Sequence, residues 1–237
     1  MSPEPRPQQT IPRSTLQWIA TAVLEYLSDD TQCLERCSRV CAFLLGQCRP
    51  LMFRELRIRD PPPGHNKPQS RFVKFVRLLK ESEALGLCLG GYIEDLHIEG
   101  TLAEWSPRPL FHPSLAAALL AMLYNLQRLT VLGVRLRGKA GELDALAQLI
   151  PKVPLLCPRK DLRELSLWSV GCMEDGFEDM LALFRLFKDV DRLAIQACHL
   201  PMLSESAERL KSTLPSALRT QYLTILGIPD AFPCAEF

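Results

Sequence analysis

A short hydrophobic phrase, apolar-x-x-Leu-x-apolar, recurs along the chain and predicts its main structural unit. A polar residue usually separates the shared leucine from the apolar residue two positions later, and this alternation favours a strand with one buried face. The copies, of which the last is weaker, occupy residues 53–58, 93–98, 126–131, 162–167, 190–195 and 222–226. Their leucines lie 40, 33, 36, 28 and 30 residues apart. Periods of this size are typical of supersecondary units that stack on one another.

Helical patterns alternate with these phrases. The apolar periodicity predicts helices near residues 72–79, 114–124, 142–150, 177–187 and 204–214. Alternating helices and strands are typical of parallel strands joined by crossovers. The sequence therefore predicts an α/β fold in which a short solenoid, similar to leucine-rich repeats, lines one side with a parallel sheet and covers the other side with helices. A protein of this kind usually presents surface to a partner, so the repeat favours binding over catalysis.

The first part of the chain has a different organisation. Residues 1–12 carry four prolines among polar residues, and we expect a disordered lead there. The pattern of residues 13–52 predicts a unit of two amphipathic helices. Ser14 and Gln17 form a capping box at the start of the first helix. Residues 53–237 form the predicted solenoid, with a proline-rich loop at 59–70.

The predicted strands also indicate which side chains face outward. Successive residues of a strand alternate between its faces, so the neighbours of each inward leucine point to the opposite side. Arginine and aromatic residues dominate the binding energy of many interfaces. The candidate target-binding residues on this side are Arg57, His97, Arg128, Thr130, Leu132, Trp168, Arg192 and Gln196. The alternative is an ordinary solvated strand face with Trp168 packed under a loop.

Composition and charge narrow the classes of partner. The 237 residues are 47% hydrophobic and have a formal net charge of +1, so no overall field attracts nucleic acid or an anionic membrane. The longest apolar stretch, 115–123, is too short to span a bilayer, and the N-terminus lacks the apolar core of a signal peptide. We therefore expect a soluble protein inside the cell, in the cytoplasm or the nucleus, without nucleic-acid or membrane partners.

The candidate chemistry is weak throughout the chain. Cys33, Cys37 and Cys41 are spaced for one helix face, which suggests either a metal or redox site or, as we favour, small buried apolar residues. The adjacent Cys198 and His199 would point apart in a strand, and the acidic residues of 174–179 suit the start of a helix better than a calcium loop. No catalytic motif is present. The sequence predicts no catalytic residue, no metal and no cofactor.

Residues 11–58 carry a more specific signal. The stretch begins with Ile11 and Pro12, reads CSRVC at 37–41 and continues as RPLMFRELRI at 49–58. It resembles the F-box-like proteins with divergent leucine-rich repeats that are abundant in fungi, and the phrases IEDLHIEG, LQRLTVLGV and LRELSLWSV resemble the second region of that family.

The resemblance implies a function and two partners. In that family the F-box docks on a Skp-type adaptor of a cullin–RING ubiquitin ligase, and the repeats hold a target protein, whose identity the sequence does not indicate. The residues that the resemblance implies for adaptor binding are Pro12, Leu16, Ile19, Leu27, Leu34, Cys37, Val40 and Leu44. The alternative is a repeat scaffold whose helices only cap the solenoid. Phe43 and Leu44 favour this alternative, because family members usually carry a tryptophan at that point.

Overall fold

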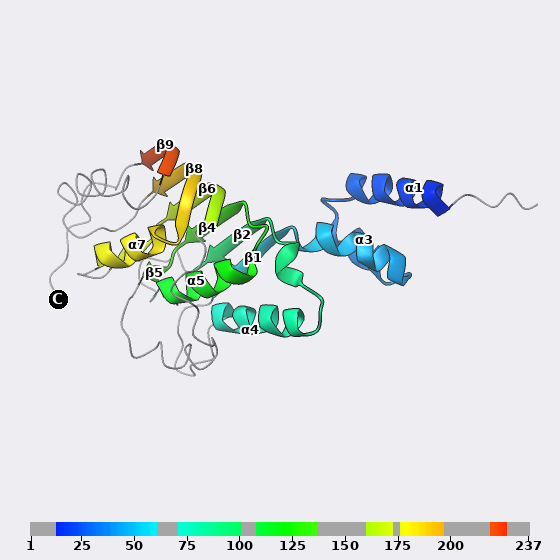
Figure 1. Cartoon of the computed structure of the whole chain (residues 1–237), viewed down its shortest axis with the longest axis horizontal. Helices are drawn as coiled ribbons and strands as arrows, with labels where there is room; N and C mark the ends of the chain where they lie inside the picture. The colour runs from blue at the N-terminus through cyan, green and yellow to red at the C-terminus, as the bar shows by residue number, and fades with distance from the viewer. Residues whose placement is uncertain are drawn as a thin grey trace, which may run out of the picture. The chain divides into compact units, whose positions relative to one another are not determined.

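The computed structural model describes residues 13–60, 71–100, 108–136, 160–172, 176–196 and 219–226. It divides the chain into two compact units, Met1–Arg54 and Glu55–Phe237 (Figure 1). We call the first the helical unit and the second the sheet unit. The predicted lead at 1–12, most of the loop at 59–70 and the predicted helices at 142–150 and 204–214 lie outside the described residues.

The helical unit contains three helices where the sequence predicts two. They are α1 (Arg13–Tyr26), α2 (Thr31–Ser38) and α3 (Ala42–Phe53). The Asp30 side chain caps α2 by accepting a hydrogen bond from the Cys33 amide at 2.9 Å. At the other end of α2, the Ser38 hydroxyl donates to the Glu35 carbonyl at 2.7 Å, a local bond of the kind that competes with helix continuation. Cys41 is then fully extended at φ −160° and ψ 164°, so the predicted second helix is divided there.

The core of the helical unit is small. Leu24, Leu34 and Cys48 are buried, one from each helix. The partly buried apolar residues that pack against them are Leu27, Cys37, Leu44, Leu51 and Met52. The leucines within residues 14–47 therefore serve mainly to pack the three helices against one another.

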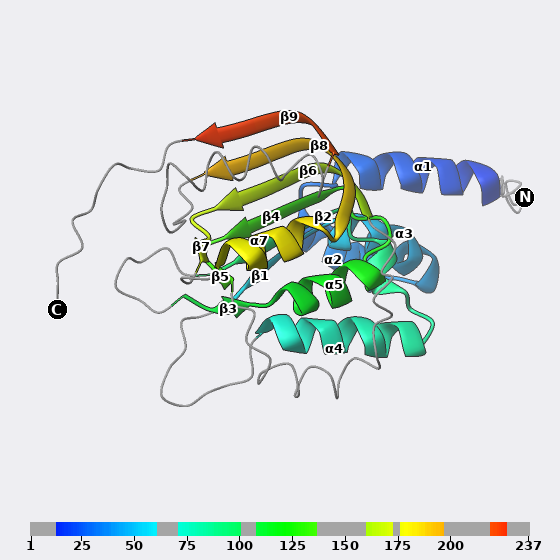
Figure 2. The ribbon, with the colours of Figure 1, turned by 60° about the vertical axis from the view of Figure 1, so that its left-hand side comes forward.

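Six parallel strands form the main sheet of the sheet unit, which confirms the predicted α/β class and parallel sheet (Figure 2). In sheet order the strands are β1 (Glu55–Arg59), β2 (Asp95–Glu99), β4 (Arg128–Leu132), β6 (Lys160–Trp168), β8 (Phe187–Gln196) and β9 (Arg219–Leu226). The shared leucines pair in one unbroken row of Leu56, Leu96, Leu129, Leu165, Leu193 and Leu223. Each copy of the repeated phrase thus supplies one strand in the same register.

Helices cover one face of this sheet, and the core of the unit lies between them. They are α4 (Arg71–Ala84), α5 (Pro113–Met122) and α7 (Gly176–Phe184), with a short 3-10 turn, η1 (Leu89–Gly91), after α4. Figure 2 shows α4, α5 and α7 lying side by side, as their contacts require. Phe72 of α4 packs edge-on against Phe111 with ring centroids 5.7 Å apart. The three predicted helices in the described residues are therefore present, with ends that differ by a few residues.

A second, smaller parallel sheet was not predicted from the sequence. Its strands, β3 (Leu110–Phe111), β5 (Arg135–Leu136) and β7 (Gly171–Cys172), pair in that order. The chain turns between the two sheets at residues such as Gly133 and Ser169, whose φ angles of 62° and 51° are left-handed. At these turns the hydrogen-bond ladder of the main sheet continues for one more bond. The Gly133 amide donates to the Trp168 carbonyl at 2.9 Å, and the Ser169 amide donates to the Gln196 carbonyl at 2.8 Å.

Candidate interaction surfaces

The face of the main sheet opposite the buried leucines carries three rows of outward positions, and we call it the sheet face. The first row is Glu55, Asp95, Arg128, Glu164, Arg192 and Tyr222. The middle row is Arg57, His97, Thr130, Ser166, Ala194 and Thr224. The third row is Arg59, Glu99, Leu132, Trp168, Gln196 and Leu226. Every candidate target-binding residue lies in one of these rows, because the register of the leucines sets the position of their neighbours.

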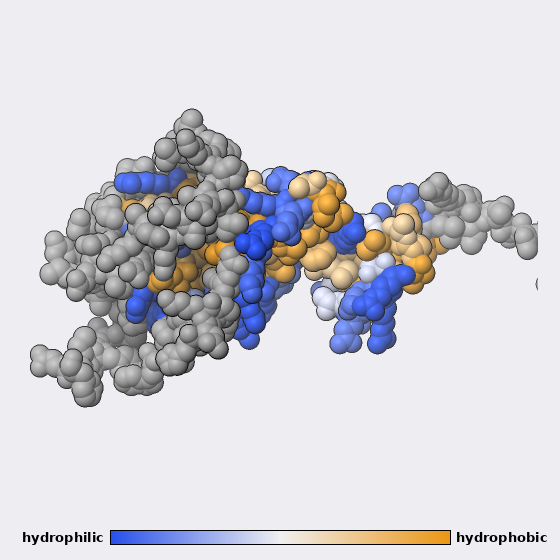
Figure 3. Space-filling view, turned by 90° about the horizontal axis from the view of Figure 1, so that it is seen from below, coloured by the Kyte–Doolittle hydropathy of each residue, from blue (hydrophilic) through white to orange (hydrophobic). Residues whose placement is uncertain are grey.

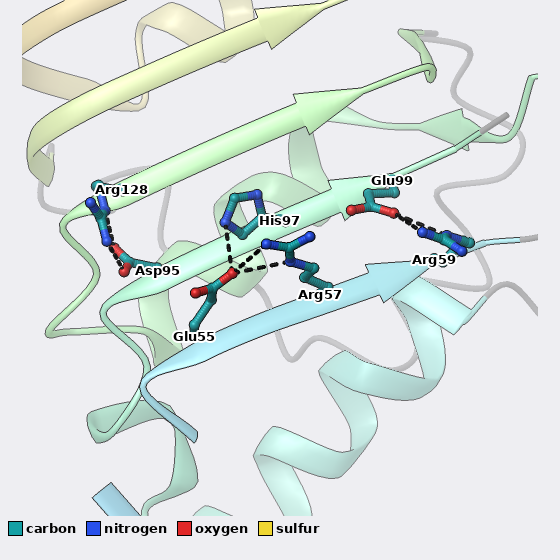
Figure 4. A network of polar contacts seen from close by, with 7 residues as sticks. All are labelled: Glu55, Arg57, Arg59, Asp95, His97, Glu99 and Arg128. Atoms are coloured by element: carbon teal, nitrogen blue, oxygen red, sulfur yellow. Dashed lines mark hydrogen bonds and ion pairs between the residues drawn. The ribbon is translucent and has the colours of Figure 1, made fainter. Parts of the chain in front are cut away.

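Arg128 and Asp95 form the most enclosed ion pair of the sheet face (Figure 4). Arg128 Nε lies 2.6 Å from Asp95 Oδ1, and a second guanidinium nitrogen bonds Oδ2, so the contact is bidentate. The Asp95 side chain is buried, whereas that of Arg128 is more than half exposed. The hydrogen bonds and the charge of Asp95 raise the pKa of Arg128, so the guanidinium remains charged wherever the protein is folded.

Two further ion pairs lie on β1 and β2. Arg57 donates from Nε and Nη2 to Glu55 Oε1 at 3.0 and 2.8 Å, and this contact raises the pKa of Arg57. Arg59 donates from Nε and Nη2 to Glu99 Oε2 at 2.9 and 2.7 Å. His97 Nε2 lies 3.6 Å from Glu55 Oε1, so the histidine joins the first of these pairs (Figure 4). The charges of β1, β2 and β4 are therefore matched within the sheet.

The strands β6, β8 and β9 present a different surface. Trp168 is 45% exposed and Tyr222 is 64% exposed, and Arg192 is exposed between them on β8. The Trp168 side chain is therefore only partly covered. Of the other candidates, Thr130, Leu132 and Gln196 are half-buried. Tyr222 was not among the sequence candidates, although its place beside Leu223 in the last phrase could have indicated it.

The helical unit exposes an apolar surface along α1. Its large side chains are Trp18, Ile19, Val23 and Tyr26, of which Trp18 is 72% and Tyr26 is 90% exposed. Positions three and four apart on a helix are neighbours, so Ile19, Val23 and Tyr26 form one stripe of a patch, and Trp18, one position before Ile19, lies beside that stripe. We call this patch the α1 face; Figure 3 shows hydrophobic surface beside hydrophilic surface on the helical unit.

The predicted adaptor-binding residues are divided between surface and core. Ile19 and Val40 are exposed. Leu27, Cys37 and Leu44 are partly buried against the core. Leu34 is completely buried, so a partner cannot contact it while the helical unit is folded. Leu16 lies in α1 but its side chain, like all of Pro12, is outside the described residues.

Sequence reasoning missed several exposed apolar residues of the helical unit. Trp18, Val23, Tyr26 and Phe43 were not candidates, yet all four are exposed apolar side chains. The available signal on α1 was the small amount of charge, since it carries only Arg13 and Glu25 and neither lies on the stripe of Ile19, Val23 and Tyr26. A surface helix normally places charged residues opposite its buried stripe. A second uncharged stripe is the feature that marks a contact surface.

The described residues offer little chemistry beyond binding. Burial raises the pKa of the Cys48 thiol, and burial together with the neighbouring Cys37 raises that of Cys33, so both thiols are poor nucleophiles at neutral pH. Within the described ranges no group of three or more His, Cys, Asp or Glu side chains could hold a metal ion. Cys198 and His199 lie outside those ranges. A search of the same residues finds no helix with the length and apolar character needed to cross a membrane.

Comparison with protein-family models, with curated proteins and with solved structures finds no match. The fold therefore defines the class: an α/β protein with a six-stranded parallel sheet, covering helices and a separate helical unit.

Proposed function

We propose that this chain is a non-catalytic interaction protein, the substrate-recruiting F-box subunit of a cullin–RING ubiquitin ligase. In this proposal the helical unit binds a Skp-type adaptor, and the sheet unit is a solenoid similar to leucine-rich repeats that holds a target protein. The α1 face is the observation that carries the proposal, because it sets four large apolar side chains in contact with water. A contiguous exposed patch of this kind marks an interaction site on a monomeric protein.

The physical argument for docking rests on burial of apolar area. Fully covering a large apolar side chain contributes about 1.5–3 kcal/mol, so four such residues contribute up to about 6–12 kcal/mol. This offsets much of the about 4–15 kcal/mol that association costs in lost freedom, and the remainder must come from contacts around the patch. Trp18 and Tyr26 are also of the residue types that dominate binding energy at interfaces. Polar residues that surround the patch would set the orientation of the partner.

The test is co-purification of the full chain with a Skp-type adaptor. Tyr26→Glu is the most informative variant, because the side chain is 90% exposed and the charge will not disturb the core. Leu85→Glu is the matched control, since Leu85 is an exposed apolar residue of the sheet unit. We expect the native chain and Leu85→Glu to retain the adaptor and Tyr26→Glu to lose it, with unchanged circular dichroism. If the native chain does not bind under conditions where an accepted F-box protein does, the proposal is wrong.

A second candidate function is a repeat scaffold whose helical unit binds no adaptor. It is favoured by the packing of Leu27, Leu34, Cys37 and Leu44, which contribute to the core of the helical unit itself. A chain that lacks residues 1–50 distinguishes the two. A docking module leaves a folded sheet unit that no longer binds the adaptor, whereas a purely structural helical unit leaves a protein that loses solubility.

A further inference from the structure

The sheet face consists of two halves that differ in chemistry. In the half formed by β1, β2 and β4, which we call the paired half, Asp95 is held by Arg128, Glu55 by Arg57 and Glu99 by Arg59. A partner that used these charges would first have to separate them from one another. Leaving the buried Asp95 carboxylate without its arginine is especially unfavourable. The paired half is therefore poorly suited to recognise an external charged group.

The half formed by β6, β8 and β9, which we call the open half, has a cation available. Arg192 is exposed and forms no ion pair with any residue that the structure describes. Glu164 is its neighbour in register, but the Glu164 carboxylate accepts a hydrogen bond from the Ser166 hydroxyl at 3.0 Å instead. The exposed rings of Tyr222 and Trp168 lie on the two neighbouring strands. The open half thus combines a cation with two aromatic side chains.

We infer that the open half is the target-binding site and that its occupant is an extended protein segment with a carboxylate for Arg192 and an apolar side chain for Trp168. The inference rests on the proposed function only in that the sheet face holds a protein target. Arginine binds carboxylates through two parallel hydrogen bonds, and an aromatic ring buries apolar area with little loss of conformational entropy. The paired half stays free of such contacts because its arginines are already occupied.

Strand geometry sets the spacing of the two contact groups on the occupant. Arg192 and Trp168 lie on adjacent strands and four register positions apart, since Trp168 pairs with Gln196. With about 3.3 Å per residue along a strand and about 4.8 Å between strands, their Cα atoms are about 14 Å apart. An extended segment covers this distance in about four residues. Ala194 lies between the two positions on β8, and its short, half-buried side chain permits the backbone of the segment to approach closely. Its register partner Ser166 on β6 is buried and is not itself a contact position.

The experiment is selection of a displayed library of random peptides on the full chain, followed by titration calorimetry of a selected peptide. We expect selected peptides to share an acidic residue about four positions from an apolar or aromatic residue. Arg192→Glu and Trp168→Ala should each weaken the peptide by roughly tenfold to a hundredfold, the loss expected for one charge-assisted contact or one buried aromatic contact. Replacing the acidic residue of the peptide by lysine should restore binding to Arg192→Glu.

The matched control is Arg59→Glu, the same substitution at an exposed arginine of the paired half that is not among the candidate target-binding residues, and it should leave peptide affinity unchanged. Adaptor binding is measured on every variant, so that failure of the peptide selection is distinguished from failure of adaptor docking. The inference is overturned if no peptide is selected, if selected peptides are basic or lack charge, or if Arg59→Glu weakens the peptide as much as Arg192→Glu does. Unchanged circular dichroism of Arg192→Glu confirms that any loss is not unfolding.

Discussion

At the scale of single residues, the position of each charge on the sheet face determines its effect on stability. Asp95 is buried while its partner Arg128 remains half in water, so the pair is asymmetric. Arg57 and Glu55, in contrast, are both well exposed. An exposed pair contributes little because solvent screens it, whereas a buried carboxylate that loses its partner keeps the whole penalty of having left water.

This asymmetry predicts different outcomes for two similar substitutions. Arg128→Ala should lower the free energy of unfolding by about 1–3 kcal/mol, because it leaves the Asp95 carboxylate without its two hydrogen bonds. Arg57→Ala should change it much less, because solvent screens the exposed pair with Glu55. Urea unfolding followed by circular dichroism measures both values. Equal effects of the two substitutions would contradict the assignment of Arg128 and Asp95 as the enclosed pair.

At the scale of elements, the turn that follows each main strand requires close packing of backbone against backbone. Gly100 follows β2, and its amide donates to the Leu132 carbonyl at 2.7 Å. A Cβ atom at Gly100 would overlap the Gly133 carbonyl oxygen and would lie 2.8 Å from Pro109 Cγ. Neighbouring turns thus lie so close to one another that only glycine fits at this position. Gly46, within α3, has nothing within 4 Å of the corresponding atom.

Alanine substitutions at these two glycines should therefore have opposite effects. Gly100→Ala should lower the free energy of unfolding of the sheet unit by about 1–3 kcal/mol, because the neighbouring turn must move. Gly46→Ala should raise that of the helical unit by about 0.5–1 kcal/mol, because alanine loses less conformational freedom than glycine in a helix. Chemical denaturation of each variant, compared with the native chain, provides the measurement. Stabilisation by Gly100→Ala would show that the turn is looser than the structure indicates.

At the scale of the whole molecule, the described residues form two separate hydrophobic cores. One contains Leu24, Leu34 and Cys48, and the other extends from Ile58 to Ile195. Residues that share no core have no direct reason to unfold together, so two-state behaviour is not expected for the complete chain. A small core of three buried side chains also stabilises its unit less than the large core does.

Differential scanning calorimetry of the full chain should accordingly show two transitions, with the helical unit melting first. Gly46→Ala should shift only the first transition to higher temperature, and Gly100→Ala should shift only the second to lower temperature. The two variants serve as each other's control, since each substitutes one glycine in one unit. A single transition that both substitutions move would contradict the independence of the two cores.

The parts of the fold that the sequence predicts are those set by local pattern. The Leu-x-apolar phrases identify the six strands of the main sheet, because the alternation of buried and exposed residues along a strand can be recognised without knowing the neighbouring strands. The same alternation places Trp168 and Arg192 on the sheet face. The two-residue strands of the second sheet carry no such pattern, and the interruption between α2 and α3 depends on a local bond of Ser38 that periodicity does not reveal.

The sequence by itself determined the repeated phrase and the class of fold, because each strand and helix is indicated by residues within one short segment. Only the tertiary structure decided which charges pair, since Arg59 and its partner Glu99 are 40 residues apart and meet through strand register. It also decided that Leu24 of α1 is core while Trp18 and Tyr26 of the same helix are surface, because a helix with two apolar stripes does not indicate which of them its neighbours will cover.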